Sequence, residues 1–114
     1  MYAMALAMPG GAVLVVDWPH GVAGDRGPAA YALLMPQPNA FTGERELVVL
    51  DIYVNPHLRG HRVARLLLDR AAGYARSIGC GMLVAQVALH NRSSLRLFEG
   101  AGFAGERVVL GRRL

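Results

Sequence analysis

Two long apolar runs separated by one helical segment constrain this chain more than any other feature. The runs are Leu47 to Val54 and Met82 to Leu89, and both are nearly continuous in apolar residues rather than alternating. Such runs are typical of strands that are buried on both faces, as in parallel sheets. Between them, apolar residues recur at helical spacing, at Val63, Leu67, Ala71, Tyr74 and Ile78. The segment therefore predicts a strand, a crossover helix and a second, parallel strand.

Glycines and an asparagine predict where the helices begin and end. Gly79-Cys80-Gly81 follows the crossover helix, and glycine just past a helix end readily takes the left-handed conformation. Asn91 is a good N-cap for a short last helix, which we expect to close at Gly100-Ala101-Gly102. Residues 106–110 then predict a final strand.

The first half of the chain predicts antiparallel strands. Strands are expected at Ala12 to Asp17 and at Ala29 to Met35, joined through turns at residues 18–21 and 24–28. Pro36-Gln37-Pro38-Asn39 should stop the second strand, and Glu44-Arg45-Glu46 should begin the central strand with its polar end. With 114 residues, the chain has room for one core and hence one domain.

The loop before the crossover helix is basic and contains a glycine. It reads Arg59, Gly60, His61, Arg62, Val63, Ala64 and Arg65. Because the loop runs directly into a helix, unpaired backbone N–H groups and the positive end of the helix dipole point out of it. These features predict a cradle for a diphosphate. The alternative is a surface turn whose arginines serve solubility.

This loop resembles a motif of the GNAT superfamily of N-acetyltransferases. The family's acetyl-CoA-binding pattern is Arg/Gln-x-x-Gly-x-Gly/Ala, which Arg59 matches at its first position and Ala64 at its last. Arg62 stands where the middle glycine is usual. Its side chain would either crowd the phosphates or supply one more charged donor to them.

A second block, residues 91–103, is similar to the family's later coenzyme-binding motif. Asn91 is followed seven residues later by the aromatic Phe98, and the block closes with Gly102-Phe103. Together the two blocks identify the chain, from about Ala12 onward, as a member of the family. The resemblance implies an α/β domain over residues 1–114, with a mixed sheet in which antiparallel strands precede a parallel strand-helix-strand coenzyme-binding unit.

The resemblance also implies a function and a set of site residues. The expected reaction transfers an acetyl group from acetyl-CoA, as co-substrate, to a primary amine of a small molecule or peptide. The backbone of Tyr53 and Val54 would pair with the pantetheine arm, in a gap where the two parallel strands splay apart. The expected coenzyme-binding residues are Tyr53, Val54, Arg59, Gly60, His61, Arg62, Val63, Ala64, Arg65, Asn91 and Phe98.

The positions expected to catalyse the reaction depart from the family pattern. Asp51 lies in an apolar run, where an unpaired carboxylate is costly, so it is a candidate base or amine-attracting group, or a structural carboxylate. The polyamine-type branch has Glu immediately before this Asp, but Leu50 fills that position. Phe98 stands where a tyrosine often protonates the departing thiolate, so it would pack on the coenzyme arm or in the core. We expect modest activity.

The net charge and the cysteine content indicate which binding partners and which cell compartment to expect. The net charge of +4 comes from arginines in the loop, the helix and the C-terminal tail, which suits a few phosphates better than nucleic acid. One cysteine and no Cys/His cluster of metal-site spacing predict a cytoplasmic, metal-free protein. Residues 1–8 lack the basic start of a signal peptide and are too short to span a bilayer.

The apolar content and the short N-terminal region bear on assembly. Apolar residues make up 54% of the chain, which indicates either a dense core or a surface shared in a homodimer. Only eleven residues precede Ala12, whereas the family has a strand and two helices there that help to wall the acceptor site. We expect the acceptor site to be open, to be completed by a second subunit, or to be lost because the start codon is misplaced.

Three other functions remain open from the sequence. The first is binding of acyl-CoA without turnover, as a regulatory or dimerisation module, which Leu50, Phe98 and the missing N-terminal region favour. The second is binding of nucleic acid through the arginines, with steeply salt-dependent affinity. The third alternative is that the domain completes the site of a partner protein, and only the high apolar content supports it.

Overall fold

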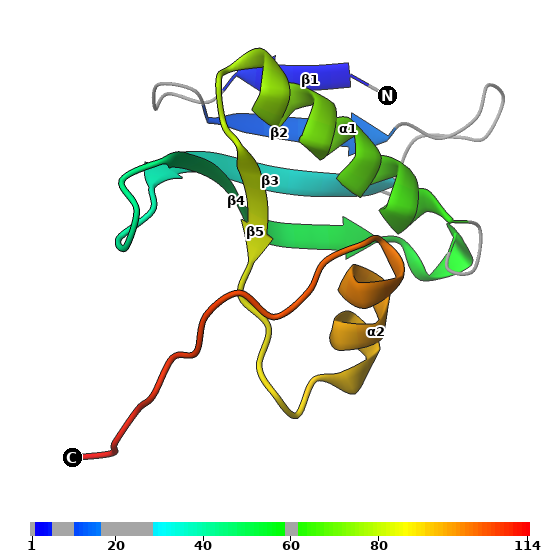
Figure 1. The fold of residues 1–114 in the computed structure, drawn as a ribbon. Helices are drawn as coiled ribbons and strands as arrows, with labels where there is room; N and C mark the ends of the chain where they lie inside the picture. Colours follow the sequence, from blue (N-terminus) through cyan, green and yellow to red (C-terminus); the bar gives the residue numbers. More distant parts are fainter. Residues whose placement is uncertain (1, 6–10, 17–28, 59–61) are drawn as a thin grey trace, which may run out of the picture.

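The computed structural model describes residues 2–5, 11–16, 29–58 and 62–114. Its sheet has five strands in the order of the sequence: β1 (Tyr2–Ala5), β2 (Ala12–Val16), β3 (Ala30–Pro38), β4 (Arg45–Val54) and β5 (Met82–Ala85). Strands β1 to β4 pair with one another in antiparallel fashion, and β5 pairs parallel to β4 (Figure 1). The expected mixed α/β sheet is therefore confirmed.

The crossover helix is α1 (Val63–Ser77), and it covers the sheet from β2 to β5. It buries Leu67, Leu68, Ala71 and Ala75 against sheet residues such as Leu34 and Leu47. The predicted stop is confirmed, since Gly79 has φ +80° and the N–H of Cys80 returns to the carbonyl of Ala75 at 2.8 Å. The apolar stripe read from the sequence is thus the face that packs on the sheet.

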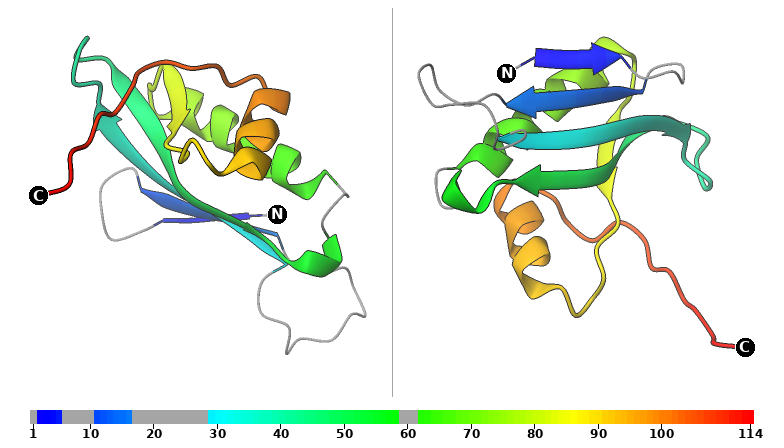
Figure 2. Two further views of the ribbon diagram at one scale, coloured as in Figure 1. Left: turned by 90° about the horizontal axis from the view of Figure 1, so that it is seen from below. Right: turned by 180° about the vertical axis from the view of Figure 1, so that it is seen from behind.

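Both helices lie on one side of the sheet (Figure 2). The short helix α2 (Arg92–Gly100) follows β5 and lies beside the C-terminal half of β4 (Figure 1). Along β3, Ala30, Ala32 and Leu34 are fully buried toward the helices, whereas Tyr31 and Leu33 on the opposite face are only partly buried. No described helix covers that second face.

Strand β3 is longer than expected. It continues through Pro36 and Pro38, which pair with Leu47 and Arg45 of β4, so the expectation that these prolines stop the strand was wrong. The pairing of β2 with β3 ends at Leu34, and in the described residues β3 then has a strand on one side only. Proline lacks an N–H donor, and such an edge position tolerates its absence.

Other predicted strand bounds were also wrong. β1 was not predicted, and β5 ends at Ala85 rather than Leu89. Residues 106–110 form no strand, and Val108, Val109 and Leu110 are about four-fifths exposed or more, at 82%, 78% and 90%. Apolar, β-prone residues form a strand only beside a strand with which they pair, and this segment leads away from β5 (Figure 1).

Some expectations fall on parts of the chain that are not described. The turns at residues 18–21 and 24–28, together with Asp17, lie outside the described residues. The short turn after β4 is described: η1 (Pro56–Leu58) is one turn of 3-10 helix, begun by the side chain of Asn55, whose Oδ1 accepts the N–H of His57 at 3.1 Å. No described helix is long and apolar enough to cross a membrane.

Candidate functional site

Strands β4 and β5 part in the middle of β4. Their parallel pairing runs from Glu46 opposite Met82 to Val49 opposite Ala85, and β4 then continues to Val54. On its other side, Val49 pairs with Leu34 and Asp51 with Leu33, so Leu50 is an extra, bulged residue. A bulge bends a strand and increases its twist, which explains why the two strands diverge here. Backbone groups of β4 beyond Leu50 thus face a gap that no described strand fills.

The bulge also changes which residues of β4 are buried. Leu47, Val48 and Val49 are buried, as expected for a strand covered on both faces, but Leu50 is 54% exposed and Asp51 is exposed too. The expectation of a carboxylate inside an apolar environment was therefore wrong, because the continuous apolar run does not reveal the bulge.

Asp51 lies in a cluster with two tyrosines on the sheet face away from the helices. The hydroxyl of Tyr31 donates to Oδ2 of Asp51 at 2.8 Å. The rings of Tyr31 and Tyr53 are stacked, with centroids 5.4 Å apart and an interplanar angle of 25°. The hydrogen bond to the Asp51 carboxylate, with a smaller effect of desolvation, raises the pKa of Tyr31. Tyr31 therefore stays a neutral donor.

The first turn of α1 begins at Arg62. Arg62 has φ 58° and ψ 20°, in the left-handed region that favours glycine, and it occupies the N-cap position without a side-chain capping bond. No acidic residue stands in the first turn. The first N–H groups of the helix thus lack a side-chain cap, which is the arrangement that attracts anions. Of the predicted loop, Arg59, Gly60 and His61 lie outside the described residues.

The side chains of the remaining loop residues make different contacts. Val63 packs against the core, and Ala64 is half-buried. Arg65 donates from Nη1 to the carbonyl of Gly100 at 2.6 Å and from Nε to Asp69 at 3.4 Å. The guanidinium of Arg65 therefore links the start of α1 to the end of α2. The part of Arg65 that points out of the helix start is its backbone N–H.

Asn91 and Phe98 belong to α2. Asn91 is the N-cap, as predicted, and its Oδ1 accepts the N–H of Ser94 at 3.3 Å and the hydroxyl of Ser93 at 3.2 Å. Phe98 is only 7% exposed and meets the edge of Phe103, with ring centroids 5.1 Å apart. In this structure Phe98 is a core aromatic.

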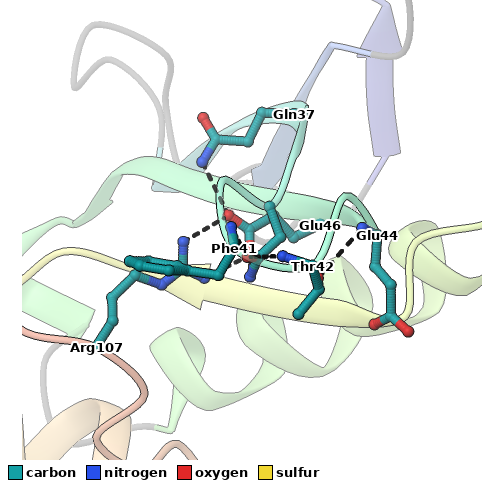
Figure 3. A network of polar contacts seen from close by, with 7 residues as sticks. Gln37, Phe41, Thr42, Glu44, Glu46 and Arg107 are labelled. Atoms are coloured by element: carbon teal, nitrogen blue, oxygen red, sulfur yellow. Dashed lines mark hydrogen bonds and ion pairs between the residues drawn. The ribbon is translucent and has the colours of Figure 1, made fainter.

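Glu46 is a buried carboxylate that no sequence pattern had indicated. This side chain is 1% exposed and accepts hydrogen bonds from Gln37 at 3.0 Å, Asn39 at 3.1 Å and Arg107 at 3.1 and 2.6 Å (Figure 3). The Arg107 guanidinium, opposed by desolvation and assisted by the two amides, lowers the pKa of Glu46 to about 2. The network holds the C-terminal segment to the beginning of β4, away from the gap.

The described residues contain no group of three His, Cys, Asp or Glu side chains that could hold a metal ion. The features that gather near the gap are the free backbone of β4, the Tyr31–Asp51–Tyr53 cluster, the start of α1 and the packed end of α2.

Comparison with known proteins connects this arrangement to a family. Residues 5–103 match the model of the acetyltransferase (GNAT) family. The chain is 36% identical over 64 residues to the L-amino acid N-acyltransferase MnaT of Escherichia coli, covering 56% of this chain and 37% of that protein. It is 40% identical over 55 residues to the putative phosphinothricin acetyltransferase YwnH of Bacillus subtilis, covering 48% and 34%. The aligned segments thus span about a third of each relative.

Solved structures share the fold. The aminoglycoside N-acetyltransferase AAC(6')-Iy in complex with CoA superposes with a TM-score of 0.74 at 19% identity, covering 94% of this chain and 78% of that one. Glucosamine-6-phosphate N-acetyltransferase from Arabidopsis thaliana gives a TM-score of 0.69 at 13% identity, covering 91% and 67%. With a family model matched over most of its length, the chain belongs to the GNAT family of acetyltransferases.

Proposed function

We propose that the 114 residues act as one domain that transfers an acetyl group from acetyl-CoA to a primary amine of a small molecule or peptide. The observation that carries this proposal is the gap between β4 and β5, which opens at Leu50 next to the uncapped start of α1. A thioester arm needs backbone partners, and a diphosphate needs N–H donors. The two features offer both.

The coenzyme would be held mainly by backbone. Tyr53 and Val54 would pair with the pantetheine arm along the free side of β4, and the N–H groups of residues 59–65 would receive the diphosphate, favoured by the helix dipole. Arg62 would add a charged donor to the phosphates. Asn91 would contact the arm from α2, and Phe98, which is packed in the core, would offer the arm no more than its small exposed edge. The CoA complex of the structural neighbour AAC(6')-Iy supports this choice of coenzyme.

The reaction would be direct transfer. The neutral amine attacks the thioester carbonyl, a C–N bond forms, the C–S bond breaks, and the departing thiolate takes up the proton that the amine loses. Holding the two reactants in line supplies much of the rate acceleration. A backbone N–H near Val54 would polarise the carbonyl, and Asp51 or a water chain would accept the amine proton. With Leu50 and Phe98 in place of a base and an acid, turnover is modest.

The chemistry of the relatives supports the choice of an amine as the acceptor. The names of these relatives refer to amino acids, phosphinothricin, aminoglycosides and glucosamine-6-phosphate, and each of these carries an amino group. The domain would act in the cytoplasm, where its buried free Cys80 stays reduced. It would do so as a homodimer, with the exposed apolar residues Val108 to Leu110 as an association surface.

A second candidate function is binding of acyl-CoA without turnover. An apolar, half-exposed Leu50 at the bulge, where the related pattern has a glutamate, favours it. The two candidates share the coenzyme site and differ only in chemistry.

A thiol-release assay separates the two candidates. The purified protein is incubated with acetyl-CoA and a panel of polyamines, amino acids and peptides, and free thiol is measured against samples that lack protein or lack amine. Amine-dependent thiol release with a matching acetylated product supports the transferase. Saturable coenzyme binding with no release on any amine supports the binding module and contradicts the transferase.

A further inference from the structure

A side chain from α1 closes the end of α2. Arg65, in the first turn of α1, donates from Nη1 to the carbonyl of Gly100, the last residue of α2, at 2.6 Å. The two residues are 35 positions apart in the sequence. The start of α1 and the end of α2 lie beside each other in Figure 1, and this bond links them directly.

The carbonyl of Gly100 depends on Arg65 for this bond. The last carbonyls of a helix have no partner within it. The three carbonyls before Gly100 receive backbone N–H groups from residues 101–103, at 3.0 to 3.1 Å, but no described backbone N–H reaches the carbonyl of Gly100. The cation of Arg65 thus caps the C-terminal end of α2, where the helix dipole favours positive charge.

Asp69 orients the guanidinium of Arg65. Its Oδ1 accepts Nε of Arg65 at 3.4 Å, from one turn further along α1. The two side chains are 52% and 64% exposed, so this ion pair by itself contributes little to stability. It does fix the plane of the guanidinium, whose donors form a rigid fork. Nε and Nη1 are therefore both engaged within the protein.

Helix α2 has few other contacts that fix its orientation. It is nine residues long, and helices of this length are marginal unless packing supports them. Phe98 is the buried residue of α2, and Leu97 is partly buried beside it. Apolar packing is non-directional, so it fixes the place of the helix better than its direction. A directional bond from a second helix restricts the direction as well.

We propose that Arg65 is a positioning residue that holds α2 against the start of α1 and so sets the spacing between two parts of the coenzyme site. The inference rests on the proposed function, in which the start of α1 receives the diphosphate and Asn91 of α2 contacts the pantetheine arm. Arg65 then acts on the coenzyme through α2, and its side chain is not a ligand of the phosphates.

A positioning role and a phosphate-binding role predict different losses of affinity. Displacement of α2 weakens a ligand that needs both parts of the site and spares a ligand that needs only the start of α1. Loss of a phosphate ligand weakens both. The matched probes are CoA and 3′-phospho-ADP, which is CoA without its pantetheine arm.

Titration calorimetry measures both affinities, and hydrogen–deuterium exchange follows residues 92–100 in the protein without ligand. The proteins are the wild type, Arg65→Met, Arg65→Lys and Arg70→Met. The last is the matched control, because it removes an exposed arginine from the middle of α1. Thermal unfolding shows that each variant is folded.

We expect Arg65→Met to raise the dissociation constant of CoA about fivefold, as for loss of one hydrogen bond, and to change that of 3′-phospho-ADP by less than about twofold. Exchange of α2 should rise about fivefold, while exchange in the middle of α1 is unchanged. Arg65→Lys keeps a donor for Gly100 but not the rigid fork, so it should recover part of the affinity for CoA. Arg70→Met should match the wild type.

Equal losses for CoA and 3′-phospho-ADP in Arg65→Met would make Arg65 a phosphate ligand and overturn the inference. It is also overturned if α2 exchanges as in the wild type, if Arg65→Met binds CoA as tightly as Arg70→Met does, or if 3′-phospho-ADP does not bind the wild type. In each of these cases CoA still binds the wild type, and the proposed function stands. Absence of CoA binding to the folded wild type removes both.

Discussion

Arg107 donates two hydrogen bonds to Glu46 across 61 residues of sequence, from Nη2 to Oε2 at 2.6 Å and from Nη1 to Oε1 at 3.1 Å. The carboxylate that receives them is buried, and two amides complete its shell. The exposed C-terminal segment is thus joined to the core of the sheet by one side chain. This contact can be removed without touching the gap between β4 and β5.

Arg107→Met should lower the free energy of unfolding by about 2 kcal/mol, because Glu46 stays buried with only its amide donors. Arg112→Met, in the same exposed segment, should change it by less than about 0.5 kcal/mol. Urea denaturation followed by circular dichroism measures both. Equal effects of the two substitutions would contradict the role assigned to Arg107.

Stability should fall in acid through Glu46. Its pKa in the folded protein, about 2, is below the ordinary value of 4.5, so folding favours the charged form. The contribution of Glu46 is complete above about pH 4.5 and is lost as the pH falls toward 2. Melting temperatures measured across this window should drop less steeply for Glu46→Gln than for the wild type. Glu44→Gln should retain the wild-type slope; a Glu46→Gln slope as steep as the wild type would exclude the assignment.

Arg62→Gly should stabilise the protein by about 0.5 kcal/mol. A non-glycine residue at φ 58° carries a steric cost of about 1 kcal/mol, which exceeds the extra chain entropy of glycine. Arg70→Gly, an exposed change in the interior of α1, should destabilise by about 1 kcal/mol. The opposite signs are measurable by denaturant unfolding. A loss of stability in Arg62→Gly would argue against a left-handed residue at this point.

Leu50→Glu should raise the rate of amine acetylation at saturating acetyl-CoA. The residue is 54% exposed at the bulge, so a carboxylate fits without burial, and a general base there should be worth about tenfold or more. Leu50→Gln has the same length and no basic oxygen, and it should leave the rate near that of the wild type. Equal rates for the Glu and Gln variants would show that position 50 does not reach the amine proton.

The features that could be predicted from the sequence differ in physical origin from those that could not. The helix α1 and the start of β4 follow from patterns within one segment, because the spacing of Leu67 and Ala71 is set by the helix itself. The bulge at Leu50 depends on register with β3, which no local pattern records. The pairing of Glu46 with Arg107 joins distant segments, and the sequence alone presents each as a surface charge.

The same distinction applies to the ends of the sheet. Residues 106–110 have the composition of a strand but no described neighbour with which to pair, while Pro36 and Pro38 continue β3 where only one side is paired. In the candidate site, Asp51 was singled out from the sequence, but its two tyrosine neighbours were not grouped with it. Tyr31 comes from another strand, and only the β3–β4 register brings it to Asp51.

The most direct test of the account is calorimetric titration with acetyl-CoA of the wild type and two charge-matched variants. Arg62→Asp places a good capping carboxylate where the diphosphate is proposed to bind, so the helix is kept and the anion is repelled. Arg70→Asp makes the same change of charge on the exposed middle of α1. We predict saturable binding to the wild type and to Arg70→Asp, with affinity at least about tenfold weaker in Arg62→Asp. No binding to the folded wild type, or equal binding to all three, would contradict a coenzyme site at the start of α1.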